Sequence, residues 1–119
     1  MTYARYNHKT GKPAQISFTF IKSLPLNGGA TLRHGCRVTF KHGYQVGQSG
    51  EIFKSAYDAF KFIRRNCGKG DWGIWRGEDG LYYVDKGVHI MGKAVALELG
   101  RQYNQQCVYG WKQDKTFDC

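Results

Sequence analysis

Residues 55–75 constrain the fold most, because they combine a capped amphipathic helix, a glycine turn and an aromatic strand. Ser55 precedes the helix and Asp58 follows three positions later, which is an acidic variant of the capping box that begins many helices. Residues 66–68, Asn-Cys-Gly, predict the end of the helix, since asparagine and glycine tolerate the left-handed backbone of a C-cap. The apolar positions recur at helical spacing and predict one buried face; they are Ala56, Ala59, Phe60 and Ile63.

Residues 93–111 form a weaker copy of this helix-then-strand unit. We expect a second helix over residues 92–103 with Asn104 as its cap, followed by a strand over residues 106–112 that contains a tryptophan, as the first strand does. Gly100 falls inside this helix at a cost of about 1 kcal/mol relative to alanine, which indicates close packing against a neighbouring element. In the two copies, Ala59, Phe60, Phe62 and Arg64 match Ala96, Leu97, Leu99 and Arg101.

The remaining strands are predicted from alternating apolar and polar residues. Asp79-Gly80 separates the last two of them, and this dipeptide between aromatic runs is a strong hairpin signal. Glycine-rich residues 42–50 are expected to form a flexible link, and residues 85–87 a turn. The predicted strands are residues 16–22, 31–34 (a short edge strand), 36–41, 71–76 and 81–84.

The order β-β-α-β-β-α-β predicts one α+β domain over residues 16–112, with two helices packed on one face of a mainly antiparallel sheet. Residues 1–15 are expected to be a basic flexible arm, and residues 113–119 a polar tail. No stretch is apolar enough to span a membrane, and residues 2–15 do not resemble a signal peptide. A cytoplasmic protein with no membrane partner is therefore expected.

The positive charge of the chain is unevenly distributed. The net charge is +9, yet the first fifty residues contain seven Lys and Arg and no Asp or Glu, while the rest carries a net charge of only +2. A field of one sign attracts phosphate-bearing or acidic partners, although net charge also serves solubility alone. The pattern favours binding to nucleic acid, RNA more than DNA, or to an acidic surface of a nucleoprotein complex.

Cations and flat rings together predict the candidate binding residues, because phosphates need the first and bases stack on the second. Strand alternation is expected to place Arg37 and Lys41 on one exposed face beside Trp75 and Tyr83, as in a stacking platform, although a second small core is the alternative for these rings. The predicted phosphate-binding residues are Arg5, Arg33, Arg37, Lys41, Arg64, Arg65, Lys69 and Arg101, and the predicted stacking residues are Trp75, Tyr83 and Tyr103.

Catalytic motifs are weak in this sequence. The His34-Gly35-Cys36 pattern allows a Cys/His dyad, but it favours a structural histidine and a core cysteine. Acids near the hairpin (Asp71, Glu78, Asp79 and Asp85) allow a magnesium-dependent nuclease, although turn geometry alone also favours acids there. No histidine has zinc-ligand spacing, so no metal, cofactor or catalytic residue is predicted. The cysteines, Cys36, Cys67, Cys107 and Cys119, lie far apart and are expected to be free or buried thiols.

Residues 94–111 resemble the C-terminal segments of small phage- and plasmid-encoded counter-defence proteins, anti-CRISPR proteins among them. The resemblance lies in the pattern A-x-A-L-x-L-G-R-x-Y-N-Q followed by the short apolar strand Cys107-Val108-Tyr109. It implies a compact protein that binds a defence component or its nucleotide signal without catalysis. DNA-mimicking inhibitors are acidic, whereas this chain is basic, so guide RNA or an acidic protein surface would be the expected target.

Three functions therefore follow as hypotheses. The first is a phage-type inhibitor that binds guide RNA or an acidic surface of a defence complex. The second is a sponge that sequesters a cyclic or other signalling nucleotide, and the third is the metal-dependent nuclease. An exposed strand edge over residues 106–112 would allow a homodimer, since unpaired edges invite strand addition.

Overall fold

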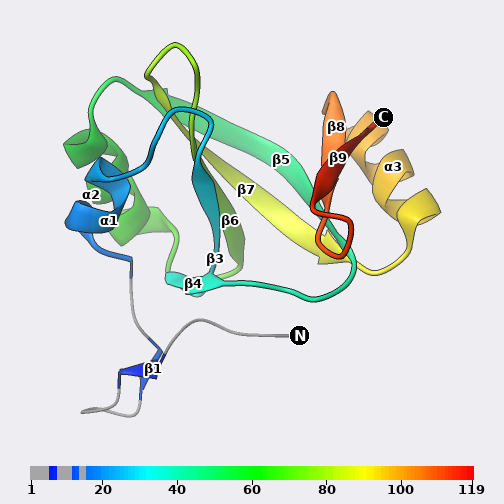
Figure 1. The fold of residues 1–119 in the computed structure, drawn as a ribbon, viewed down its shortest axis with the longest axis horizontal. Coiled ribbons are helices and arrows are strands. Elements are labelled where there is room, and N and C mark those ends of the chain that lie inside the picture. Colours follow the sequence, from blue (N-terminus) through cyan, green and yellow to red (C-terminus); the bar gives the residue numbers. More distant parts are fainter. Residues whose placement is uncertain (1–5, 8–11, 14–15) are drawn as a thin grey trace.

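The fold is built around one curled antiparallel sheet (Figure 1). The structure, a computed structural model, describes residues 6–7, 12–13 and 16–119. Its seven-stranded sheet has the order β4-β3-β6-β7-β5-β8-β9, and all its pairs are antiparallel. The strands are β3 (Gly29–Arg33), β4 (Cys36–Val38), β5 (Tyr44–Phe53), β6 (Asp71–Arg76), β7 (Tyr82–Ile90), β8 (Cys107–Gly110) and β9 (Lys115–Asp118).

The described residues also contain three helices and a separate two-stranded sheet. The helices are α1 (Phe18–Lys22), α2 (Ala56–Asn66) and α3 (Lys93–Gln102), and β1 (Tyr6–Asn7) pairs with β2 (Lys12–Pro13) in the small sheet. The predicted α+β class with a mainly antiparallel sheet is confirmed. None of the helices in the described ranges has the length and apolar character that crossing a membrane requires.

Helix α2 forms where its local signals predict. Ser55 is the N-cap, and its hydroxyl accepts a hydrogen bond from the backbone N–H of Asp58 at 3.1 Å. Ala59 and Ile63 are buried on the predicted apolar face. The helix ends at Cys67, whose N–H donates to the carbonyl of Ile63, and the left-handed glycine comes later, at Gly70.

The strand predicted over residues 16–22 is wrong, because most of this segment forms α1. The hydroxyl of Ser17 caps the helix by accepting a hydrogen bond from the N–H of Phe20 at 3.1 Å. Ile21 is completely buried, and Phe18 packs against Tyr57 and Phe60 of α2 at ring-centroid distances of 5.8 Å. A short apolar run does not distinguish strand from helix by periodicity, so the contact with α2 decides it.

The link predicted over residues 42–50 and the turn predicted over residues 85–87 are also wrong. Residues 44–50 and 85–87 are strand, because β5 pairs with β7 from Tyr44↔Ile90 to Phe53↔Tyr82, with one irregularity between Gly47 and Ser49. Glycine and serine have low strand propensity, so the pairing with a distant partner overrides the local preference.

The predicted tail and the predicted dimer edge need correction as well. Residues 115–118 form β9, which pairs with β8, and β5 covers the other side of β8. Strand β8 therefore lies inside the sheet, paired with β5 at Tyr109 and Gly110, and the outermost strands of the main sheet are β4 and β9. Strand β3, expected at an edge, lies between β4 and β6.

Most of the hydrophobic core lies on the face of the sheet that the helices cover, and a smaller cluster of Cys36, Val38 and Phe40, with Trp111 packed against it, lies on the opposite face. Val84 and Ile74 belong to the cluster packed against α1 and α2, while Val46 and Val108 belong to the cluster under α3. Val84 of the first cluster and Val88, which packs against the second, lie four positions apart on β7 and are therefore on the same face of the sheet, so the two clusters share that face. The predicted close packing of Gly100 is confirmed, since a β-carbon there would lie 2.5 Å from Sγ of Cys119.

Candidate ligand groove

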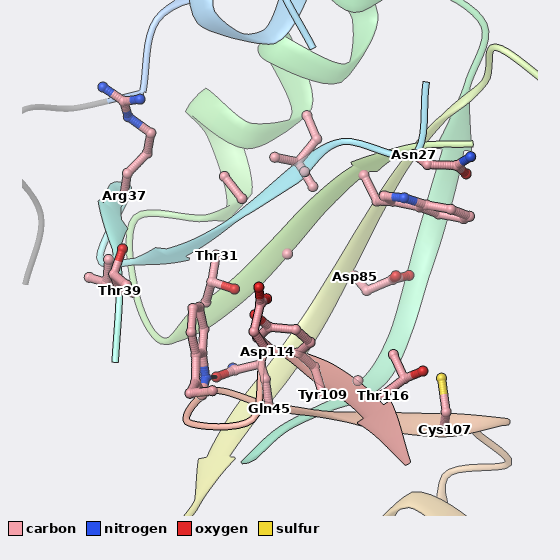
Figure 2. Close-up of a pocket in the computed structure, with 18 of the residues that line it drawn as sticks. Asn27, Thr31, Arg37, Thr39, Gln45, Asp85, Cys107, Tyr109, Asp114 and Thr116 are labelled. Atoms are coloured by element: carbon pink, nitrogen blue, oxygen red, sulfur yellow. Dashed lines mark hydrogen bonds between the residues drawn. The ribbon is translucent and has the colours of Figure 1, made fainter. Parts of the chain in front are cut away.

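The opposite face of the sheet carries a groove of about 1170 Å³ (Figure 2). The sheet curls so that its distant strands approach across this face: Phe40, which follows β4, packs edge-on against Trp111, which follows β8, at a centroid distance of 5.4 Å. Trp111 Nε1 also donates to Gln45 Oε1 at 3.3 Å. The groove-lining residues used below are Asn27, Gly29, Thr31, Arg37, Gln45, Gly73, Trp75, Asp85, Tyr109, Asp114 and Thr116.

One row of cross-strand neighbours forms an exposed apolar surface at one end of the groove. Trp75 of β6 lies opposite Tyr83 of β7, and Tyr83 lies opposite Ile52 of β5. The Trp75 and Tyr83 rings have a centroid distance of 5.3 Å, and Trp75 is 44% exposed. We call Trp75, Tyr83 and Ile52 the aromatic shelf. Its exposed ring faces are available to stack on a flat ligand.

The next row places a carboxylate between two glycines. Asp85 of β7 lies opposite Gly73 of β6 on one side and Gly50 of β5 on the other. A β-carbon at Gly50 would overlap Oδ1 of Asp85, so only glycine leaves room for this carboxylate. A β-carbon at Gly73 would meet no atom within 4 Å. The space above Gly73, in the same row as Asp85, is therefore open, and we call it the glycine floor.

Asp85 has no hydrogen-bond or ion-pair partner among the described residues, as is also true of Glu51 on β5 and Asp118 on β9, whereas three other acids near the sheet are engaged. Asp71 binds Arg33, Asp79 accepts a hydrogen bond from Tyr83, and Asp114 accepts one from Tyr109. The Asp85 side chain is exposed, yet the protein around it still desolvates the carboxyl enough to raise its pKa, since desolvation disfavours the charged form. The carboxylate is therefore available to a ligand.

We predict that Asp85→Asn slightly stabilises the protein at neutral pH. A carboxyl whose pKa is raised on folding favours the protonated form in the folded state, so its charged form opposes folding above that pKa. Because the side chain stays open to the groove, the gain should be within about 0.5 kcal/mol. Urea unfolding should show the difference from wild type shrinking as the pH falls through the raised pKa. A loss of stability at neutral pH would contradict the prediction.

The other end of the groove offers one unsatisfied donor. Gln45 Nε2 is buried and has no hydrogen-bond partner in the part of the chain that the structure describes, while Oε1 of the same residue accepts a hydrogen bond from Trp111. Tyr109 lies beside Trp111 at a centroid distance of 5.1 Å and donates its hydroxyl proton to Asp114. Burial, together with this hydrogen bond, raises the pKa of Tyr109 to about 12, so its hydroxyl stays protonated at neutral pH.

The predicted phosphate-binding residues do not gather in this groove. Arg33 makes a bidentate ion pair with Asp71, at 2.7 and 2.8 Å. Arg37 lies opposite Leu32, a core residue, and its guanidinium lies 4.2 Å from the centroid of the Phe20 ring. Figure 2 shows Arg37 at the rim, directed away from the other labelled side chains. The expected platform of Arg37 beside Trp75 and Tyr83 is thus divided between the two faces of the sheet.

The remaining predicted residues lie elsewhere. Arg101 pairs with Glu98 on α3 at 3.1 Å, and Tyr103 accepts a hydrogen bond from Gln48 Nε2 at 3.1 Å. Arg64, Arg65, Lys69 and Lys41 are exposed, the first two on α2 and Lys69 in the turn that follows it. Arg5 falls outside the described residues. Of the predicted stacking residues, the structure brings together only Trp75 and Tyr83.

The hairpin acids do not form a metal site in the described ranges, where no group of three His, Cys, Asp or Glu residues could hold a metal ion. Asp71 is engaged by Arg33, and the hydrogen bond from Tyr83 lowers the pKa of Asp79. The four cysteines are free, and burial raises the pKa of Cys67 to about 12. A thiolate nucleophile is therefore disfavoured at Cys67.

The sequence signals missed the polar part of the groove. Asp85 falls in Asp-Lys-Gly, a turn-like tripeptide, and Gly73 and Gln45 carry no motif. The one local sequence signal for the groove is Gly73, a residue without a side chain on the face of β6 opposite Trp72 and Ile74. Neither the sequence nor the fold matches a known protein family, a curated protein or a solved structure. Evidence on function therefore comes from the chemistry of the groove.

Proposed function

We propose that this protein works by binding a small ligand that contains a flat ring, with the ring on the aromatic shelf and the rest of the ligand over the glycine floor. The supporting observation is the exposed Trp75 ring next to the unfilled space above Gly73. Small-molecule sites are typically concave, mostly apolar and lined by a few polar groups, and they measure about 300–1,000 Å³. This groove has that character and is slightly larger.

Binding to RNA or to a host-defence complex stays a prediction, because it depends on a basic surface whose target no described feature identifies. A nucleotide sponge would need cations near the phosphate. Among the described groove-lining residues, Arg37 is the one cation, and it extends over Phe20 at the rim. A nucleotide could therefore place its base on the shelf, but its phosphate would have no cation inside the groove.

Two variants test the proposal with ring compounds of different charge: benzamidine, benzamide, benzoate, adenosine and adenosine monophosphate. Trp75→Ala removes the stacking surface, and Gly73→Val adds bulk to the floor, where a β-carbon would meet no atom within 4 Å. We expect each variant to weaken binding about tenfold or more, since stacking contributes about 1–3 kcal/mol per ring. Titrations followed by tryptophan fluorescence and by NMR of the indole N–H groups measure the affinities.

The matched control is Gly68→Val, because Gly68 also has no atom within 4 Å of a β-carbon and lies outside the groove. This variant should bind as wild type does. If none of the five compounds saturates the wild-type protein, or if Gly73→Val binds them unchanged, the proposed function is wrong.

A further inference from the structure

We infer that the group recognised in this groove is an organic cation of the amidinium or guanidinium type, bound between the carboxylate of Asp85 and the ring face of Trp75. This inference rests on the proposed binding role of the groove and specifies the chemical class of its ligand. It follows from the placement of three residues, Asp85, Gly73 and Trp75, and from the charges of the other lining residues.

The first step concerns Asp85. Asp85 is an exposed carboxylate that a ligand in the groove can reach. Here the protein supplies no partner among the described residues, and glycines flank the carboxylate in its row on both sides. Gly50 makes room for the carboxylate itself, while Gly73 leaves space beside it. A ligand can therefore approach Asp85 from the groove, because no side chain occupies the space above Gly73.

The second step concerns Trp75. It lies opposite Tyr83, two residues before Asp85 on β7, so Trp75 and Asp85 are diagonal neighbours, which are about 7–8 Å apart in antiparallel sheets. The face of an indole ring is electronegative and attracts cations within about 6 Å. Oδ1 of Asp85 lies over Gly50, on the other side of β7 from Gly73, so a planar cation that contacts both this carboxylate and the indole face would lie above β7 rather than over Gly73.

The third step concerns charge. The described residues that line the groove include two acids, Asp85 and Asp114, and one cation, Arg37, which extends over Phe20 at the rim. An anionic ligand would therefore approach carboxylates without a compensating cation inside the groove. A planar amidinium or guanidinium suits the site better than an ammonium, because it can stack on the indole and donate two parallel hydrogen bonds to one carboxylate.

The test compares benzamidine with its near-isosteres benzamide, which is neutral, and benzoate, which is anionic. We expect wild type to bind benzamidine at least about tenfold more tightly than either, as charge-assisted hydrogen bonds are the stronger kind. Asp85→Asn should abolish this preference. Asp114→Asn is the matched control, because it removes a groove carboxylate that Tyr109 already engages, and it should retain the preference for benzamidine.

The cation could belong to a free metabolite or to an arginine side chain, and two further probes separate these sources. Agmatine represents the first, and N-acetyl-arginine amide the second, with N-acetyl-citrulline amide as its uncharged counterpart. Tighter binding of agmatine indicates a small metabolite, and tighter binding of the arginine amide indicates a peptide. Either result supports the inference only if Asp85→Asn weakens the binding of the tighter-binding probe.

The outcomes distinguish this inference from the proposed function. If benzamide, benzoate or a nucleotide binds as tightly as benzamidine, or if Asp85→Asn leaves the preference unchanged, the cation inference is overturned while groove binding stands. If no compound of any charge binds, both are overturned. Unchanged or raised thermal stability of Asp85→Asn shows that a loss of binding is not a loss of folding.

Discussion

Leu32→Ala is expected to lower the free energy of unfolding by about 2–5 kcal/mol, the range for removing a buried leucine side chain. Leu32 is completely buried in the cluster that joins β3 to α1 and α2. It lies opposite Trp72 on β6 and opposite Arg37 on β4, so the sheet holds it from both sides. The cavity can therefore close only partly. Urea denaturation followed by circular dichroism measures the change.

Leu26→Ala is the matched control for this prediction. Leu26 undergoes the same change in side chain but is 53% exposed, so its replacement should alter the free energy of unfolding by about 0.5 kcal/mol or less. Equal losses for the two variants would show that the core is not where the structure places it. Since Leu32 faces the helices, a folded Leu32→Ala protein should retain the binding properties of the groove.

Asp71→Asn is expected to destabilise the protein by about 3 kcal/mol, because it removes the charge from a buried partner of a bidentate ion pair. Asp71 is 7% exposed and accepts hydrogen bonds from two nitrogens of Arg33. The variant would leave the Arg33 guanidinium, whose side chain is 23% exposed, facing a neutral amide. Chemical denaturation at neutral pH measures the loss.

Glu98→Gln provides the comparison, since it also removes a carboxylate bound to an arginine. The Glu98–Arg101 pair is exposed on α3, and such pairs contribute about 0–1 kcal/mol. A double-mutant cycle with Arg33→Gln and Asp71→Asn should give a coupling free energy of at least about 1 kcal/mol. A coupling near zero would contradict a structural role for the ion pair and would return Arg33 to the candidates for phosphate binding.

The two faces of the sheet thus have different roles. The helix-covered face contains the two larger clusters that stabilise the fold, whereas the other face has a smaller cluster around Phe40, glycines in its middle rows and exposed rings at one end. Glycine in a strand interior lowers strand stability, so the row of Gly73, Asp85 and Gly50 contributes little to folding. Its open space and unpartnered carboxylate instead fit a ligand site.

The elements with strong local signals could be predicted from the sequence. Helix α2 has a capping serine and an apolar stripe, and the β6–β7 hairpin has Asp79-Gly80 between aromatic runs. These signals act within a few residues, so they do not depend on the rest of the chain. Strand alternation also predicted that Trp75 and Tyr83 share one face, as the register of β6 and β7 shows.

Only the tertiary structure decided the remaining elements and the polar half of the groove. Strand β5 and the second half of β7 stabilise each other across a long sequence separation, although each reads as loop alone. Asp85 becomes a groove residue because the register sets it between Gly73 and Gly50, and Arg33 is neutralised because the same register brings it to Asp71. Composition determines that the chain is basic and rich in aromatic residues, but pairing between distant strands determines which of those residues meet, since a shift by one residue would move each side chain to the other face.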